Sequence, residues 1–68
     1  MAELLDVVEL RVDSGRWEAG TRGTVVEVLD AGALVEISDG HGHTEEIIAV
    51  PHDALRAVTK PEQRRLLV

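Results

Sequence analysis

Cysteine, phenylalanine and tyrosine are absent from this chain of 68 residues, and tryptophan occurs once, as Trp17. Without cysteine the chain can form neither disulfide bonds nor thiolate metal sites, and this composition fits a cytoplasmic protein. A domain this short buries only about 60% of the surface that its unfolded chain exposes. Its stability must therefore come from a well-patterned aliphatic core, from a partner or from a second copy of itself.

Long apolar runs are missing as well, since none approaches the roughly 18 residues that a membrane-spanning helix needs. The first six residues contain two acids and no base, which is not the pattern of a signal peptide. We therefore expect no association with a membrane.

Basic residues are outnumbered, with seven lysines and arginines against thirteen acids and a net charge of -6. The acids concentrate in residues 1–50, whereas residues 51–68 carry more bases than acids. Because an acidic domain repels phosphate backbones, nucleic-acid binding is disfavoured for the body of the protein. The acidity serves either solubility or steering toward a basic partner.

Short alternating segments rich in valine and isoleucine predict five strands, at residues 5–12, 23–29, 33–37, 43–50 and 55–58. In the first three strands every second apolar residue should face the core, namely Val8, Leu10, Val12, Val26, Val28, Ala33, Val35 and Ile37. Gly32, in the connection before the third strand, suits a positive φ. Pro51 should end the fourth strand and begin a short 3-10 turn that Asp53 caps.

Five short strands with turn signals between them indicate an all-β barrel or sandwich. At this length a small five-stranded barrel is the economical solution, because it hides the edges of its sheet. We expect the barrel to span residues 1–59, with the 3-10 turn before its last strand, and residues 60–68 to form a C-terminal tail.

Three stretches of the chain resemble a known family: Val7–Leu10, Ala19–Val26, which contains a G-x-x-G-T-V-V core, and Val50–Val58. The resemblance is to uncharacterised small bacterial proteins marked by a GTVV motif, one of the domain-of-unknown-function families. It covers roughly residues 4 to 58 and implies an SH3-like barrel with no established activity. Some members of that family are encoded beside predicted toxins, which implies antitoxin or immunity roles.

The glycine-rich core also resembles the KOW-type turn of ribosomal and transcription-factor SH3-like barrels and the barrel of the nitrile hydratase β subunit. Members of the KOW group that bind nucleic acid are typically basic, whereas this chain is acidic. Gly20–Gly23 itself is interpreted as a tight turn rather than a phosphate-binding nest, because no helix follows it.

A metal site is suggested by four residues spaced by two, because His-x-His is a real transition-metal arrangement. The glycines among them favour a solvated hairpin tip instead, so we expect no metal at Asp39, His41, His43 and Glu45. No catalytic site is expected either. The two serines, Ser14 and Ser38, lack the context of a nucleophile, and so small a barrel has little room for a cleft. We expect neither enzymatic activity nor a cofactor.

Trp17 is expected either to close one end of the barrel or to anchor a protein partner. As the only aromatic residue it cannot build the groove through which ordinary SH3 domains bind proline-rich peptides. The tail ends in two arginines and three apolar residues, which a solvated terminus does not need. The residues expected to contact a partner are therefore Trp17, Arg22, Arg64, Arg65, Leu66 and Leu67.

These features predict a non-enzymatic protein-interaction module, such as an antitoxin or immunity protein whose acidic body masks a basic surface. One alternative is a KOW-like nucleic-acid or ribosome-associated module that uses Arg22, Arg64 and Arg65. Another is an accessory domain that forms a homodimer through its apolar tail.

Overall fold

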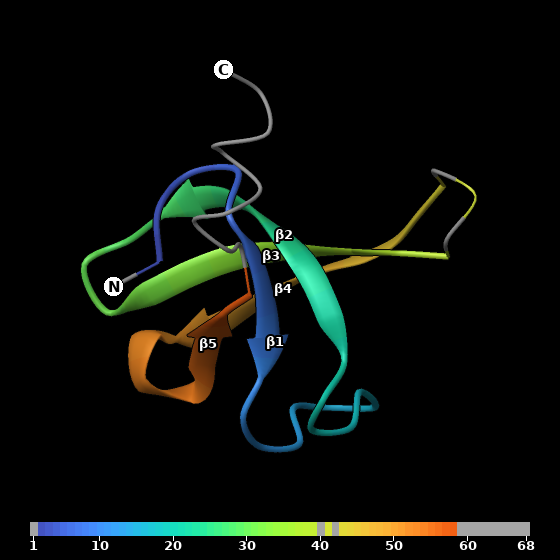
Figure 1. Cartoon of the computed structure of the whole chain (residues 1–68), viewed down its shortest axis with the longest axis horizontal. Helices are drawn as coiled ribbons and strands as arrows, with labels where there is room; N and C mark the ends of the chain where they lie inside the picture. Colours follow the sequence, from blue (N-terminus) through green and yellow to red (C-terminus); the bar gives the residue numbers. More distant parts are fainter. Residues whose placement is uncertain (1, 40, 42, 59–68) are drawn as a thin grey trace.

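The computed structural model describes residues 2–39, 41 and 43–58, which form five β-strands in one antiparallel sheet and contain no α-helix (Figure 1). The prediction of an all-β fold with a 3-10 turn before its last strand is confirmed. No helix in this part of the chain has the length and apolar character that crossing a bilayer requires. The elements are β1 (Val7–Leu10), β2 (Arg22–Val28), β3 (Gly32–Ser38), β4 (Thr44–Pro51), the 3-10 turn η1 (His52–Ala54) and β5 (Leu55–Ala57).

The strands follow the order β4-β3-β2-β1-β5, so that the first strand lies between the second and the last. Val8 of β1, for example, pairs with Gly23 of β2 on one side and with Ala57 of β5 on the other. Within the described residues the edge strands β4 and β5 do not pair with each other, and closure into an SH3-like barrel stays a prediction. The predicted tail, residues 60–68, lies outside the described residues.

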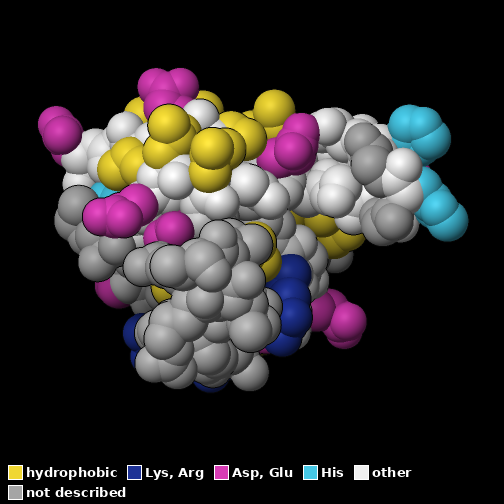
Figure 2. Space-filling view, turned by 45° about the horizontal axis from the view of Figure 1, so that its top comes forward, with side chains coloured by type: hydrophobic (Ala, Val, Ile, Leu, Met, Phe, Trp, Pro, Cys, Tyr) yellow, Lys and Arg dark blue, Asp and Glu magenta, His cyan; other side chains and the backbone are white. Residues whose placement is uncertain are grey.

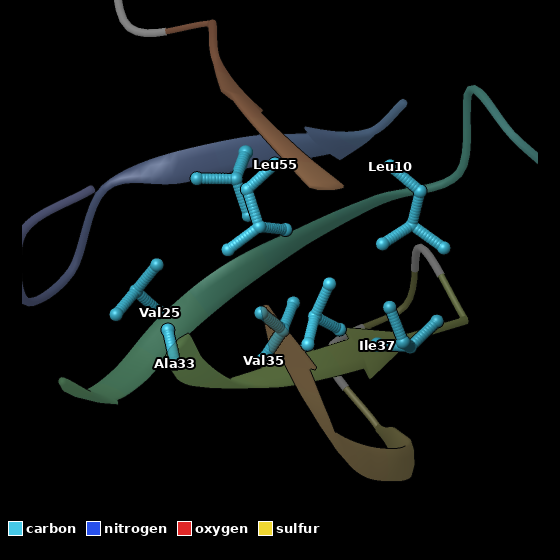
Figure 3. Packing of buried hydrophobic residues seen from close by; sticks show 8 residues of the cluster. Leu10, Val25, Ala33, Val35, Ile37 and Leu55 are labelled. Atoms are coloured by element: carbon cyan, nitrogen blue, oxygen red, sulfur yellow. The ribbon is translucent and has the colours of Figure 1, made fainter. Parts of the chain in front are cut away.

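The core is made of aliphatic side chains from all five strands, which point toward one another between the two ends of the curled sheet (Figure 3). In β3 the alternation of buried and half-buried residues places Ala33, Val35 and Ile37 in the core, as predicted. Among the described residues, the buried apolar side chains are those of Val8, Leu10, Val25, Ala33, Val35, Ile37, Val50 and Leu55.

The predicted inward residues of β2 are wrong. Val25, not Val26, is buried and pairs with Val35, and a β-bulge then shifts the register between Val25 and Glu27. Val28 lies at the end of the strand and is exposed. Because a bulge inserts one extra residue, it changes which side chains face the core. In β1 the prediction for Val12 is also wrong, since the strand ends at Leu10 and Val12 is 55% exposed.

Two glycines let neighbouring strands approach closely. At Gly23 an added Cβ would lie 2.6 Å from the backbone oxygen of Glu36. At Gly32 it would overlap the backbone oxygen of Val50. The predicted positive φ at Gly32 is wrong, since this residue is not among the glycines with a positive φ. Glycine is required there because the backbone of β4 approaches too closely for a side chain.

Candidate interaction surfaces

A tight turn before β1 places two leucines in solvent. The N–H of Asp6 donates to the carbonyl of Glu3 at 3.0 Å, and the carboxylate of Asp6 accepts from the N–H of Glu3 at 2.9 Å. Leu4 and Leu5 occupy the two central positions of this turn. Leu5 has a φ of 68°, at the position where a type II turn usually has glycine, and its side chain is 71% exposed. The turn therefore presents a leucine to solvent from a backbone conformation that leucine rarely adopts.

The turn lies beside the bulged half of β2. The N–H of Leu5 donates to the carbonyl of Val25 at 2.7 Å, and the N–H of Val25 donates to the carbonyl of Asp6 at 2.9 Å. Farther along β2 and just after it, two more large apolar side chains are exposed. We call this set the apolar surface; its members are Leu4, Leu5, Val28 and Leu29.

Acidic residues border the apolar surface in the sequence, at Glu3, Asp6, Glu27 and Asp30. Figure 2 shows hydrophobic side chains gathered on one side of the molecule with acidic side chains among them, while the arginines lie apart. Single exposed apolar residues are normal on a protein, but a gathered set marks an interaction site. The chemistry of this surface suits a ligand that is both apolar and positively charged.

A shallow hollow adjoins the apolar surface. It has a volume of about 230 Å³ and almost entirely apolar walls, and it shares Leu29 with the apolar surface. Beside it, Nε2 of His52 donates to the carbonyl of Leu29 at 2.8 Å, and Nδ1 of His52 is buried without a hydrogen-bond partner in the described residues. The hollow is smaller than a typical small-molecule pocket. It shares Leu29 with the apolar surface and therefore extends that surface. The remaining residues that line it are Ala31, Gly32, Ala33, Ala49, Val50 and Pro51.

Trp17 lies at the tip of the long connection between β1 and β2. It exchanges two backbone hydrogen bonds with Ser14 across a tight turn in which Gly15 has a φ of 56°. Its ring is half-buried against the core, and its Nε1 donates to Oε1 of Glu46 at 2.7 Å. The guanidinium of Arg16 lies 4.3 Å from the ring centre and donates to the same oxygen. Of the two roles predicted for Trp17, these contacts favour that of a lid.

This cluster also affects the acidity of Glu46. The hydrogen bond from Trp17 and then that from Arg16 lower the pKa of the Glu46 carboxyl. The indole N–H of Trp17 donates to the carboxylate of Glu46, and Arg16 covers one face of the ring. These contacts within the chain leave little of the Trp17 side chain accessible to another protein. Its role as a partner anchor stays a prediction.

Arg22, another predicted contact residue, belongs to a row that crosses three strands. Strand pairing places Arg22 of β2 and Arg56 of β5 opposite Glu9 of β1, one on each side. Nε of Arg22 donates to the carboxylate of Glu9 at 3.5 Å, and Nη2 of Arg56 donates to its other oxygen. The hydrogen bond from Arg56, aided by the charges of both arginines, lowers the pKa of the Glu9 carboxyl.

In the predicted hairpin tip, Asp39 accepts hydrogen bonds from two of the residues that follow it. Its carboxylate accepts from the backbone N–H groups of His41 at 2.7 Å and His43 at 3.2 Å, and these bonds lower the pKa of the Asp39 carboxyl. No group of three or more potential metal ligands is gathered anywhere in the described part of the chain.

Asp53 does not cap η1, because no side chain donates or accepts a capping hydrogen bond at the start of this turn. Its capping role was predicted wrongly, and its backbone carbonyl instead accepts from Arg11.

A family model described as Domain of unknown function (DUF4926) matches residues 4–57, which is most of the chain. The chain belongs to the DUF4926 family. The predicted membership of an uncharacterised domain family is thereby confirmed. The match runs from the exposed turn at Leu4 to the end of β5 and includes the whole apolar surface. No curated protein and no solved structure matches the DUF4926 chain.

The two predicted contact residues that the structure of the DUF4926 domain describes, Trp17 and Arg22, belong to different clusters. Trp17 belongs to the corner with Glu46, and Arg22 belongs to the row with Glu9. Four others, Arg64, Arg65, Leu66 and Leu67, lie outside the described residues. Sequence reasoning missed the apolar surface, because it assigned Val28 to the core. The one available signal was the pair Leu4-Leu5, apolar residues placed between two acids and ahead of the first alternating segment.

Proposed function

We propose that the DUF4926 domain is a non-enzymatic protein-interaction module of the antitoxin or immunity type. Its apolar surface binds a basic, apolar segment of a partner protein. The observation that carries this proposal is the exposure of Leu4 and Leu5 at the tip of a tight turn bordered by acids.

The turn is unfavourable for the isolated domain in two ways. Placing a leucine in the left-handed region costs roughly 1–2 kcal/mol, and exposing its side chain forgoes the free energy that burial would provide. Residues held in such conformations concentrate at functional sites. Burial of the Leu5 side chain against a partner would supply free energy that offsets these costs in the complex. The exposed turn is therefore explained if it is a binding site.

The charges define the partner. Glu3, Asp6, Glu27 and Asp30 are sequence neighbours of the residues of the apolar surface, and the chain carries a net charge of -6. Complementary charge speeds encounter and excludes acidic partners. A segment with alternating basic and apolar residues fits this pattern, and covering such a segment is how an antitoxin masks a basic surface. A cytoplasmic location is part of the same proposal and is supported by the absence of cysteine.

The KOW-like alternative is favoured by one observation, the alignment of Arg22 and Arg56 on neighbouring strands. Two observations oppose it. Glu9 lies between the two arginines and neutralises part of their charge. The one tryptophan is half-buried with a guanidinium over its ring, so it is poorly placed to stack on a base.

The test uses a ten-residue peptide of alternating lysine and leucine, with a lysine–serine peptide as control, and titration calorimetry as the readout. The domain should bind the first peptide, and Leu5→Gly should weaken that binding about tenfold or more, since burying a leucine contributes about 1.5–3 kcal/mol. Leu5→Gly should not lower the melting temperature, because glycine relieves the strain at that φ.

Val12→Gly is the matched control, since Val12 is also exposed but lies away from the apolar surface. It should leave the affinity unchanged. Equal binding of the lysine–serine peptide, or equal loss in both variants, would show that the apolar surface is not the binding site.

A further inference from the structure

Two arginines from distant parts of the chain lie on either side of one glutamate. Arg22 and Arg56 flank Glu9, and because neighbouring strands lie about 4.8 Å apart, the two stand about 10 Å from each other on one side of the sheet. We call this pair, Arg22 and Arg56, the arginine row.

The row keeps most of its donors available. The side chain of Glu9 is only 17% exposed, whereas those of Arg22 and Arg56 are 66% and 65% exposed. A guanidinium has five N–H donors in a planar fork, and within the described residues each of these two arginines contacts Glu9 through one nitrogen. Glu9 therefore acts as an anchor. It holds both guanidinium groups on the same side of the sheet, while its own negative charge offsets part of theirs.

We propose that the arginine row binds a short acidic segment of a protein, with one carboxylate on each of the two flanking arginines. Two positive charges beside one negative charge leave the row cationic on an otherwise acidic domain. Arginine forks match carboxylates with two parallel hydrogen bonds. This assigns the domain a second surface, whose charge preference is opposite to that of the apolar surface and which is independent of it.

An acidic protein segment fits better than a nucleic acid. A nucleic acid brings a long array of phosphates, which the net charge of -6 repels, whereas a short acidic segment brings only a few charges to the row. Binding of single strands also relies on exposed aromatic platforms. The sequence has no phenylalanine or tyrosine, and Arg16 lies over the ring of Trp17.

The experiment titrates the full chain at low salt with a ten-residue peptide of alternating glutamate and serine, and in parallel with a ten-nucleotide thymidine strand. The peptide should bind more tightly than the strand. Arg22→Gln and Arg56→Gln should each weaken peptide binding about tenfold, the loss expected for one charge-assisted contact. Arg16→Gln removes the same charge at the Trp17 corner and should leave the affinity nearly unchanged.

Glu9→Gln separates binding from a merely structural role. It removes the competing carboxylate, so it should tighten peptide binding several-fold even though it lowers the melting temperature. Glu18→Gln changes the net charge equally at an exposed loop residue and should have a much smaller effect. Absence of peptide binding, equal losses in Arg16→Gln, weaker binding in Glu9→Gln or tighter binding of the thymidine strand would each overturn the proposal. Because no variant touches Leu4 or Leu5, failure here leaves the apolar surface untouched.

Discussion

The indole Nε1 of Trp17 donates a 2.7 Å hydrogen bond to Oε1 of Glu46, which ties the connection between β1 and β2 to strand β4. The two residues are 29 positions apart in the sequence, and Arg16 donates to the same oxygen at 3.2 Å. We call Arg16, Trp17 and Glu46 the Trp17 corner. It links the connection between β1 and β2 to the start of β4. It holds the half-buried ring of Trp17 against the core.

We expect Trp17→Phe to lower the free energy of unfolding by about 1 kcal/mol, because the ring remains but the hydrogen bond to Glu46 is lost. Urea unfolding followed by far-ultraviolet circular dichroism measures this difference. Arg16→Gln, which keeps the indole bond and loses an exposed ion pair, should cost less. A Trp17→Phe variant as stable as the wild type, together with the fluorescence of a fully solvated tryptophan in the wild type, would contradict the lid.

Gly23→Val should destabilise the fold by about 1–3 kcal/mol, which is the usual cost of overpacking. The reason is crowding, since a Cβ at Gly23 would lie 2.6 Å from both the backbone oxygen of Glu36 and Cγ1 of Val35. Comparison of melting temperatures with that of Ala19→Val, a substitution in an exposed loop, isolates the effect of position. If the two variants melt at the same temperature, β2 and β3 are not packed as closely as described.

Acid should destabilise the domain in a defined range of pH. The pKa values of Glu9, Asp39 and Glu46 are lowered, the first chiefly by the hydrogen bond from Arg56. A folded-state pKa below the unfolded-state value means that the stabilisation is complete above the ordinary values of 4.5 and 3.8 and is lost as the pH falls through the folded-state values. The free energy of unfolding should therefore be nearly constant from pH 7 to about pH 5 and decline below that.

Urea titrations of Glu9→Gln at several pH values test the assignment to that residue. The variant should be less stable than the wild type at pH 7, and the two should converge in acid, where Glu9 of the wild type is protonated. A stability difference that persists unchanged at pH 3 would mean that the ion pairs with Arg22 and Arg56 do not carry the effect.

The sequence predicted β3 well and β2 poorly for a physical reason. In Ala33–Ile37 the buried residues Ala33, Val35 and Ile37 alternate along the strand, and β3 itself has no bulged residue among them. In β2 three valines stand at positions 25, 26 and 28, and this pattern does not reveal where a bulge inserts its extra residue. Val28 pairs with the buried Ala33 after the bulge, and it is exposed because it is the last residue of the strand.

The arginine row could not be predicted from the sequence for a related reason. Glu9, Arg22 and Arg56 lie far apart in the chain, and only the registers of β1 with β2 and with β5 bring them together. Local periodicity fixes which face a residue takes but not which residue of another strand it meets. The turn that exposes Leu5 could not be predicted from the sequence either. Its φ of 68° is typical of glycine, and a leucine at this position does not indicate a turn.

Deleting residues 61–68 should change either the oligomeric state or the amide exchange of the remaining strands. These residues include a basic pair and three apolar residues, which complement an acidic, partly apolar surface. Light scattering gives the mass, and hydrogen exchange followed by mass spectrometry gives the protection of each segment. If the shortened and the full chain agree in both measurements, the tail has no packing role and the prediction is wrong.

The account rests on the apolar surface as the place where a partner binds, and mapping by nuclear magnetic resonance tests this most directly. Titration of the labelled domain with the lysine–leucine peptide should shift the amide signals of residues 3–6 and 25–30, which carry or border Leu4, Leu5, Val28 and Leu29. The signals around Trp17 and Glu46 should stay in place. Shifts concentrated at that corner or spread evenly over the sheet, or no shifts at all, would contradict the account.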